Sequence, residues 1–157
     1  MHNDGQPERP PSALAASEAP ADASNAPDGI TVALLSGGRS DAIEQRARHL
    51  DIEHCRTGVG DKRSGLELLR SELAMTREQT AFLGDDLNDL AVRPVSGLLI
   101  NPADASRSLR RQADLVLTSR GGEAVPREYT EALLNSSGSL DLAYSRRWRE
   151  INDANGA

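Results

Sequence analysis

Three acidic residues lie close together in the segment Gly84-Asp85-Asp86-Leu87-Asn88-Asp89, directly after an apolar run that ends at Leu83. Carboxylate oxygens are the ligands that Mg²⁺ prefers, and three carboxylates at the end of a buried strand repel one another unless a cation is present. Asp85, Asp86 and Asp89 are therefore predicted metal ligands, and Gly84 is expected to allow a tight backbone turn. A solvated acidic turn is the alternative. A calcium loop fits poorly, because the alternating acidic positions and distant Glu of an EF-hand are missing.

A second candidate site is the segment Ser36-Gly37-Gly38-Arg39-Ser40, which also follows an apolar run and precedes a helical pattern. A hydroxyl group together with backbone N–H groups at a helix N-terminus can hold an anion such as phosphate. The same residues are equally typical of an ordinary turn followed by a helix cap.

Lys62 opens another helical pattern, where its compact positive charge could neutralise a phosphoryl group. A solvated surface lysine is the alternative. The histidines His2, His49 and His54 show no metal-binding spacing. Cys55 is the only cysteine, which rules out an internal disulfide, and we expect it to be a buried small apolar residue.

The elements that must position these residues alternate along the chain. Continuous apolar runs of strand length alternate with segments whose apolar residues recur at helical spacing, as is typical of a parallel sheet covered by helices on both faces. The expected strands are 30–36, a short one near 53–56, 80–84, 97–101 and 114–118, and the expected helices are 40–50, 63–74, a short piece after the acidic turn, 104–112 and 123–134. Ligands bind such sheets at the carboxyl ends of the strands, where the candidate residues fall.

Composition excludes several classes of function. The 157 residues carry 18 basic and 24 acidic side chains and only 3% aromatic residues, so neither a phosphate backbone nor stacked bases of nucleic acid are expected partners. No apolar stretch approaches the roughly 18 residues that span a bilayer, and the N-terminus lacks a signal-peptide pattern. We therefore expect a soluble cytoplasmic protein that contacts neither nucleic acid nor membrane.

The chain divides into three parts by composition. Residues 1–29 hold five of the eight prolines and almost no large apolar residue, which predicts a disordered Pro/Ala-rich tail. Residues 30–135 form the predicted α/β core. Residues 136–157 are expected to be a tail or a short surface helix that carries Tyr144 and Trp148.

The order of these segments is more specific than any one of them. A strand followed by Ser, then Lys, then a strand followed by GDDxxD resembles the later motifs of the haloacid dehalogenase superfamily. Within it the chain is most similar to the 3-deoxy-D-manno-octulosonate 8-phosphate phosphatase family, which is related to a domain of CMP-sialic acid synthetases. The segments that carry this resemblance are ITVALLSGGRS, Gln45-Arg46-Ala47, TGVGDK, AFLGDDLNDL, GLLINPADA, ADLVLTSRGG and Arg127-Glu128.

The resemblance implies a three-layer, Rossmann-like parallel sheet of the haloacid dehalogenase type, without a cap domain. It implies Mg²⁺-dependent hydrolysis of a phosphorylated sugar acid or another small phosphomonoester, through an aspartyl-phosphate intermediate. A second Asp, two residues after the nucleophile, would act as general acid and base. Such an activity belongs to lipopolysaccharide biosynthesis.

The resemblance also implies roles for particular residues. Ser36 and Lys62 match catalytic positions that hold the phosphoryl group, with Gly37 and Arg39 as further phosphate-binding candidates. Asp85 matches a Mg²⁺ ligand, while Asp86 and Asp89 match positions that bind or orient the metal. Arg127 matches an arginine that reaches substrate from a neighbouring subunit of a tetramer, so a homo-oligomer is expected.

The sequence departs from this family in its first 29 residues. The nucleophile motif, a strand followed by Asp-x-Asp-Gly, is missing: Asp4-Gly5 follows no apolar run, and Asp22 and Asp28 lie in the Pro/Ala-rich segment. The first strand is therefore expected to be absent, which would expose an edge or gap in the sheet. Two smaller departures are Gly38 in place of an Arg, for which Arg39 could substitute, and Glu123-Ala124-Val125-Pro126 in place of Gly-Ala-Val after the glycine pair.

Three hypotheses about function follow. The chain is a family member that cannot turn over substrate alone, or a non-catalytic module for oligomerisation or sugar-phosphate binding, or a fragment that a partner chain completes with the missing strand and Asp-x-Asp.

Overall fold

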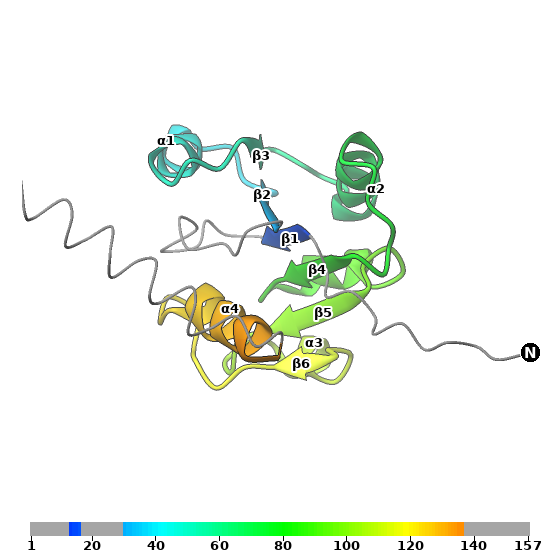
Figure 1. Cartoon of the computed structure of the whole chain (residues 1–157), viewed down its shortest axis with the longest axis vertical. Helices are drawn as coiled ribbons and strands as arrows, with labels where there is room; N and C mark the ends of the chain where they lie inside the picture. The colour runs from blue at the N-terminus through cyan, green and yellow to red at the C-terminus, as the bar shows by residue number, and fades with distance from the viewer. Residues whose placement is uncertain (1–12, 17–29, 137–157) are drawn as a thin grey trace, which may run out of the picture.

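The chain folds around a parallel sheet of six strands in the order β3-β2-β1-β4-β5-β6 (Figure 1). A computed structural model describes residues 13–16 and 30–136. The strands are β1 (Ala13–Ala16), β2 (Thr31–Leu35), β3 (His54–Arg56), β4 (Thr80–Leu83), β5 (Leu98–Asn101) and β6 (Leu115–Val116). Every pairing is parallel, so the predicted α/β architecture is confirmed.

Strand β1 corrects the expectation that the first strand is absent and that residues 1–29 are disordered throughout. Ala13–Ala16 pairs with β2 on one side and with β4 on the other, so that Ala15 lies opposite both Ala33 and Phe82. Hydrophobic periodicity missed this strand because Ala-Leu-Ala-Ala contains a single large apolar residue. A central strand is held by backbone hydrogen bonds to both neighbours, and those bonds do not require large side chains. The predicted gap in the sheet is therefore filled.

The remaining predictions for the two ends of the chain lie outside the described residues. They are the disorder of residues 1–12 and 17–29, with Asp4, Asp22 and Asp28, and the tail or helix of residues 137–157.

Among the described residues there are five helical elements, of which four connect successive strands from β2 to β6 and the fifth follows β6. They are α1 (Asp41–His49), α2 (Lys62–Glu72), the 3-10 helix η2 (Leu87–Val92), α3 (Arg107–Arg110) and α4 (Val125–Ser136). Each falls where a helical pattern was predicted, and α3 is shorter than the expected 104–112. Ser40 caps the start of α1, because its hydroxyl accepts a hydrogen bond from the Ala42 N–H. Asp61 caps α2 in the same way, which makes Lys62 the first residue of that helix.

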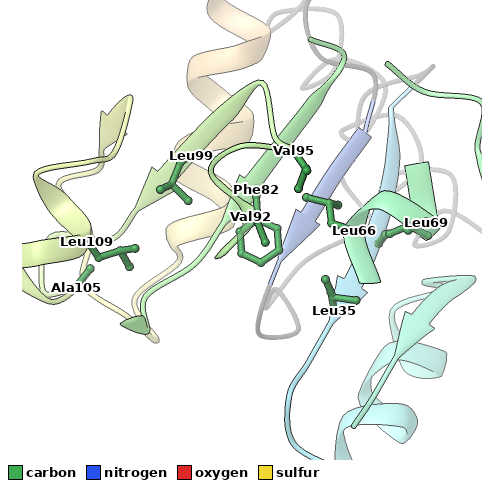
Figure 2. Close-up of a cluster of buried hydrophobic side chains, with 10 residues drawn as sticks. Leu35, Leu66, Leu69, Phe82, Val92, Val95, Leu99, Ala105 and Leu109 are labelled. Carbon is green, nitrogen blue, oxygen red and sulfur yellow. The ribbon is translucent and has the colours of Figure 1, made fainter. Parts of the chain in front are cut away.

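The core lies on both faces of the sheet. On one face, Phe82 and Leu99 pack with residues of α2, η2 and α3 in a cluster that includes Leu66 and Leu109 (Figure 2). On the opposite face, α1 covers Leu34, and α4 covers Ile100 through Tyr129. Burying a Leu or Phe side chain stabilises a fold by about 1.5–3 kcal/mol, so these clusters fix the strand ends relative to one another. No helix within the described part of the chain is long and apolar enough to span a membrane.

Candidate active site

The loops that follow the strands bring the predicted site residues to one edge of the sheet. The loop after β2 is joined to the loop after β3 by two backbone hydrogen bonds, from the Gly58 N–H to the Gly38 carbonyl (2.9 Å) and from the Val59 N–H to the Ser36 carbonyl (3.0 Å). The Gly84 N–H likewise bonds the carbonyl of Ile100, which joins the ends of β4 and β5. These bonds fix the ends of neighbouring strands in two pairs, β2 with β3 and β4 with β5.

Lys62 and Asp89 form a buried ion pair at the centre of this edge. The Lys62 Nζ lies 2.5 Å from the Asp89 Oδ1, and the two side chains are 9% and 0% exposed. The pair joins the start of α2 to η2. Removing one partner of such a pair leaves an uncompensated buried charge, which is strongly destabilising. The prediction that Lys62 is a site residue rather than a solvated surface lysine is thus consistent with its position.

The second oxygen of Asp89 holds the turn after β4. Its Oδ2 accepts hydrogen bonds from the backbone N–H groups of Asp85 and Asp86, each at 3.0 Å. Gly84 is required by this carboxylate, because a Cβ atom there would lie 2.5 Å from the Asp89 Oδ2. The glycine serves close approach of a side chain, and its φ is not positive, so the expected reason for Gly84 differs from the structural one.

Asp85 and Asp86 occupy different environments on this turn. Asp86 is exposed and caps η2 by accepting a hydrogen bond from the Leu87 N–H (2.7 Å). Asp85 is half-buried, and burial together with the nearby charge of Asp89 raises the pKa of its carboxyl group. Burial and the negative charge of Asp89 therefore disfavour the ionised form of Asp85, and a cation bound there would offset both effects.

Within the described residues, no three Asp, Glu, His or Cys side chains form a group that could hold a metal ion by themselves. The three predicted ligands are not assembled as a set, because the Asp89 oxygens are directed to Lys62 and to the backbone of the turn. Asp85 and Asp86 remain the predicted ligands, and the geometry of Asp89 fits the orienting role.

Ser36 is buried at the end of β2, with 7% of its surface exposed. Its Oγ accepts a hydrogen bond from the Gly38 N–H at 3.2 Å, a contact that both an anion-binding turn and an ordinary turn allow, so the anion-binding role of Ser36 stays a prediction. Gly37, the residue after this serine, lies close to the lysine side chain, since a Cβ atom at Gly37 would be 4.0 Å from the Lys62 Cε. The loop that carries the predicted hydroxyl group therefore approaches the side chain that carries the predicted ammonium group.

A cavity of about 660 Å³ opens beside Gly37 and Lys62. It lies between the loop after β2, the start of α2 and the start of η2. Its lining residues are Gly37, Val59, Gly60, Asp61, Lys62, Leu87, Asn88 and Ala91. The cavity is large enough for a small phosphorylated ligand, because ligand pockets run to about 300–1,000 Å³.

The two predicted arginines lie farther from the buried pair. The Arg39 side chain packs against Gly58, where its Nε, Cγ and Cδ occupy the space that a Cβ atom would need. Gly58 also has a φ of +67°, so glycine is favoured there on both grounds. Arg127 is exposed in the first turn of α4. The phosphate-binding roles of both arginines stay predictions.

Sequence reasoning assigned no role to three polar residues at this edge. The buried Asn101 ends β5 and donates from Nδ2 to the Gly84 carbonyl at 2.8 Å, while its Oδ1 has no protein partner in the described residues. Asp104 and Glu128 accept hydrogen bonds from the loop after β6. Asn101 and Asp104 lie at or just after the end of β5, and Glu128 lies in the first turn of α4. These positions were the only features of the sequence that could have marked the three residues as part of the site.

Cys55 lies on the edge strand β3 and is partly buried. Burial, together with the charge of Glu44, raises the pKa of its thiol, which favours the unreactive protonated form. This environment agrees with the expected apolar role.

The sequence of the chain was compared with those of known proteins. No family model matches the chain. Among curated relatives, the 3-deoxy-D-manno-octulosonate 8-phosphate phosphatase KdsC of Escherichia coli K12 is 36% identical over 114 residues, which are 73% of this chain and 61% of the relative. The same enzyme of Yersinia pestis is 35% identical over the same shares. The chain therefore spans 61% of the length of these relatives.

Solved structures agree in fold. A probable YrbI family phosphatase from Pseudomonas syringae pv. phaseolica superposes with a TM-score of 0.80 at 29% identity, covering 90% of this chain and 94% of that one. The chain has the haloacid dehalogenase phosphatase fold. The 3-deoxy-D-manno-octulosonate 8-phosphate phosphatase from Yersinia pestis follows with a TM-score of 0.76 at 26% identity, covering 83% of this chain and 84% of that one.

A third haloacid dehalogenase phosphatase structure bears on ligands. The enzyme from Moraxella catarrhalis, in complex with a magnesium ion, a phosphate ion and a KDO molecule, superposes with a TM-score of 0.79 at 21% identity. It covers 88% of this chain and 94% of that one. At this identity the likeness shows the fold alone. Together the comparisons confirm the predicted resemblance to the 3-deoxy-D-manno-octulosonate 8-phosphate phosphatases.

Proposed function

We propose that this chain binds Mg²⁺ and the phosphoryl group of a phosphorylated sugar acid at the edge formed by Ser36, Lys62 and Asp85, and that it does not hydrolyse the phosphomonoester alone. The observation that carries the first half is the buried pair of Lys62 and Asp89, because Asp89 also holds the turn that carries Asp85. The relatives' activity on 3-deoxy-D-manno-octulosonate 8-phosphate supports the substrate class.

Each group has a defined task in this proposal. The Ser36 hydroxyl and the N–H groups after it bind phosphoryl oxygens, while the Lys62 ammonium neutralises their charge. Asp85, with Asp86, would hold Mg²⁺, since both carboxylates lie on the turn and that of Asp85 is short of positive charge. Bound Mg²⁺ would neutralise charge on the transferring phosphoryl group. Asp89 holds the Lys62 side chain and the turn after β4 in fixed positions relative to each other.

The second half of the proposal rests on the absence of a nucleophile from the printed sequence. No Asp-x-Asp occurs anywhere in the 157 residues, and β1 is followed by Ser17-Glu18-Ala19-Pro20. Chemistry through an aspartyl-phosphate needs a carboxylate that attacks phosphorus. The chain therefore acts as a binding module, or a chain that supplies such a carboxylate completes it.

The filled centre of the sheet favours the binding module over completion by a partner's strand. Ala13–Ala16 already pairs with both neighbours, so a partner strand would first have to displace it. A homo-oligomer and a cytoplasmic location stay predictions, and light scattering on the full chain tests the first.

Calorimetric titration with Mg²⁺ and then with inorganic phosphate tests the binding half. We expect binding to the parent chain, loss of Mg²⁺ binding in Asp85→Asn, and unchanged binding in Glu67→Ala, which removes one exposed carboxylate on α2. A parent chain that binds neither ligand would overturn the proposed site.

Phosphate release from 3-deoxy-D-manno-octulosonate 8-phosphate tests the other half. We expect none above the buffer rate at any Mg²⁺ concentration. Turnover that requires Mg²⁺ and disappears in Asp85→Asn would show that the chain is an enzyme by itself.

A further inference from the structure

The loop between β6 and α4, residues 117–124, approaches Asp85, because a Cβ atom at Gly121 would lie 3.9 Å from the Asp85 Oδ2. Figure 1 shows this loop between β6 and α4. We propose that Asp104 is a positioning residue that fastens this loop beside Asp85 and so closes the site on its β5–β6 side. The inference rests on the proposed function only in taking Asp85 as the metal-binding carboxylate.

Asp104 holds the loop by its backbone. Its Oδ1 accepts a hydrogen bond from the Gly121 N–H at 2.7 Å, and its Oδ2 lies 3.8 Å from the Arg120 Nε. A backbone bond from the Ala103 N–H to the Ser119 carbonyl (2.9 Å) lies beside these contacts. The hydrogen bond from Gly121, together with the charge of Arg120, lowers the pKa of the Asp104 carboxyl group, so the acceptor stays ionised at neutral pH.

Gly121 is the point at which the loop meets the site. The position of a Cβ atom at Gly121 would be 3.5 Å from the Asp104 Oδ1 and 3.9 Å from the Asp85 Oδ2. The glycine therefore lies between two carboxylates that come from different loops, after β4 and after β5. One of these carboxylates, that of Asp104, binds the loop through the Gly121 N–H, and the other belongs to the turn after β4. Releasing Asp104 would remove the contact that keeps the loop next to Asp85.

The rest of the loop is held in a conformation that needs such a contact. Glu128 fixes the beginning of the loop by accepting from the N–H groups of Thr118 (2.8 Å) and Ser119 (2.7 Å). Beyond Gly121, Gly122 and Ala124 both have positive φ, of 81° and 58°. A positive φ at an alanine is disfavoured, so the closed form of the loop depends on its anchors at either end.

Limited digestion of the full chain with trypsin measures loop opening directly, because Arg120 is 68% exposed and precedes the anchored Gly121. We expect Asp104→Ala to speed cleavage after Arg120 by about tenfold, as lost hydrogen bonds to a charged acceptor would predict. Asp104→Asn should restore the parent rate, since its amide oxygen still accepts from the Gly121 N–H. Glu123→Ala, an exposed change within the same loop, is the matched control and should leave the rate unchanged.

Cleavage after Arg63 in α2, followed by mass spectrometry in the same digest, separates loop opening from general unfolding. Equal acceleration at both sites, or no acceleration in Asp104→Ala, would overturn the positioning role. Mg²⁺ affinity gives a second measurement: we expect about tenfold weaker binding in Asp104→Ala and recovery in Asp104→Asn. A parent chain that binds no Mg²⁺ would refute the proposed function, while the cleavage rates would still decide whether Asp104 fastens the loop.

Discussion

Strands β1 and β4 lie side by side in the centre of the sheet and end at the same level, since Ala16 is paired with Leu83. The chain that follows β4 enters a turn held by one buried carboxylate, whose two oxygens contact Lys62 and the backbone of Asp85 and Asp86. The chain that follows β1 reads Ser17-Glu18-Ala19-Pro20 and offers no Asp-x-Asp.

The difference between these two strand ends shows that the residues needed to form a strand are not the same as the residues needed for catalysis. A strand position in a parallel sheet can be filled by backbone hydrogen bonds alone, so Ala-Leu-Ala-Ala suffices for β1. A phosphoryl-transfer site needs particular side chains after these strands, and of the two segments only the one after β4 contains Asp residues at its start. The haloacid dehalogenase fold is therefore compatible with a sequence that contains no Asp-x-Asp.

The largest expected effect comes from giving the end of β1 the motif that it lacks. The triple change Ser17→Asp, Ala19→Asp and Pro20→Gly places Asp-x-Asp-Gly directly after the strand. We expect phosphate release that requires Mg²⁺ and exceeds the parent rate by about tenfold or more, because a carboxylate nucleophile is then available.

The double change Ala19→Asp and Pro20→Gly is the matched control, because it lacks the attacking carboxylate. It should stay at the parent rate. A triple variant that binds Mg²⁺ and phosphate but releases no product would show that more than the nucleophile motif is missing from the β1 side.

The next largest effect is expected at the end of β4. Asp89→Ala leaves the Lys62 ammonium buried without a partner and releases the Asp85 turn, so we expect a loss of about 3–5 kcal/mol in the free energy of unfolding. Urea denaturation followed by circular dichroism measures it. Glu67→Ala breaks only an exposed pair on α2 and should change stability by less than about 1 kcal/mol. Similar losses of unfolding free energy in both variants would mean that the buried pair stabilises the fold no more than an exposed pair does.

A proline in β1 tests whether this strand is as central as β4. Ala15→Pro removes a backbone donor from a strand that is paired on both sides, and we expect it to cost about 3 kcal/mol. Ala15→Ser keeps the donor and should cost less than about 1 kcal/mol. Equal urea midpoints for the parent and the proline variant would show that β1 does not contribute to the stability of the sheet.

Most of the fold could be predicted because strands β2, β4 and β5 are continuous apolar runs and because Ser40 marks the start of α1. Strand β1 could not, since three alanines give neither the alternation nor the hydrophobicity on which strand prediction depends. Its place in the sheet is decided by two neighbours that are distant in sequence. The information lies in β2 and β4, not in residues 13–16.

The site could be predicted to the level of residue types at strand ends, but not to the level of their partners. The spacing of GDDLND gave three equivalent carboxylates, whereas the structure directs Asp89 to Lys62, which lies 27 positions away along the chain. Asp104 and Glu128 were missed because each bonds a backbone N–H group of another loop, and no local pattern records such a bond.

Glu128 extends the comparison to the end of β6, where a carboxylate again holds a turn by its backbone. Partial burial would raise the pKa of Glu128, but hydrogen bonds from Thr118 and Ser119 outweigh it and lower the pKa from 4.5 to about 2. Because the pKa of Glu128 is lower in the folded chain than in the unfolded chain, its ionised form stabilises the fold at pH values above 4.5. That stability is lost as the pH falls from 4.5 towards 2. In Glu128→Gln we expect about 1 kcal/mol less stability at pH 7 and a flatter decline over this range, measured by urea denaturation at several pH values. An unchanged pH profile would mean that these bonds add nothing to folding.

The smallest effect concerns Ala124, which stands in the glycine-rich loop with a φ of 58°. A left-handed conformation costs an alanine roughly 1–2 kcal/mol, and glycine adopts it freely but loses about 0.5–1 kcal/mol through the entropy of the unfolded chain. Ala124→Gly should therefore stabilise the chain by about 0.5–1 kcal/mol in urea denaturation. Ala132→Gly, at an exposed position inside α4, should destabilise it by a similar amount, because glycine weakens a helix.

If both glycines destabilise, the loop is not strained at Ala124, and its closed form does not depend on the anchors at Asp104 and Glu128. If they act in opposite directions, the loop after β6 stores strain that those two carboxylates hold in place, just as Asp89 holds the turn after β4.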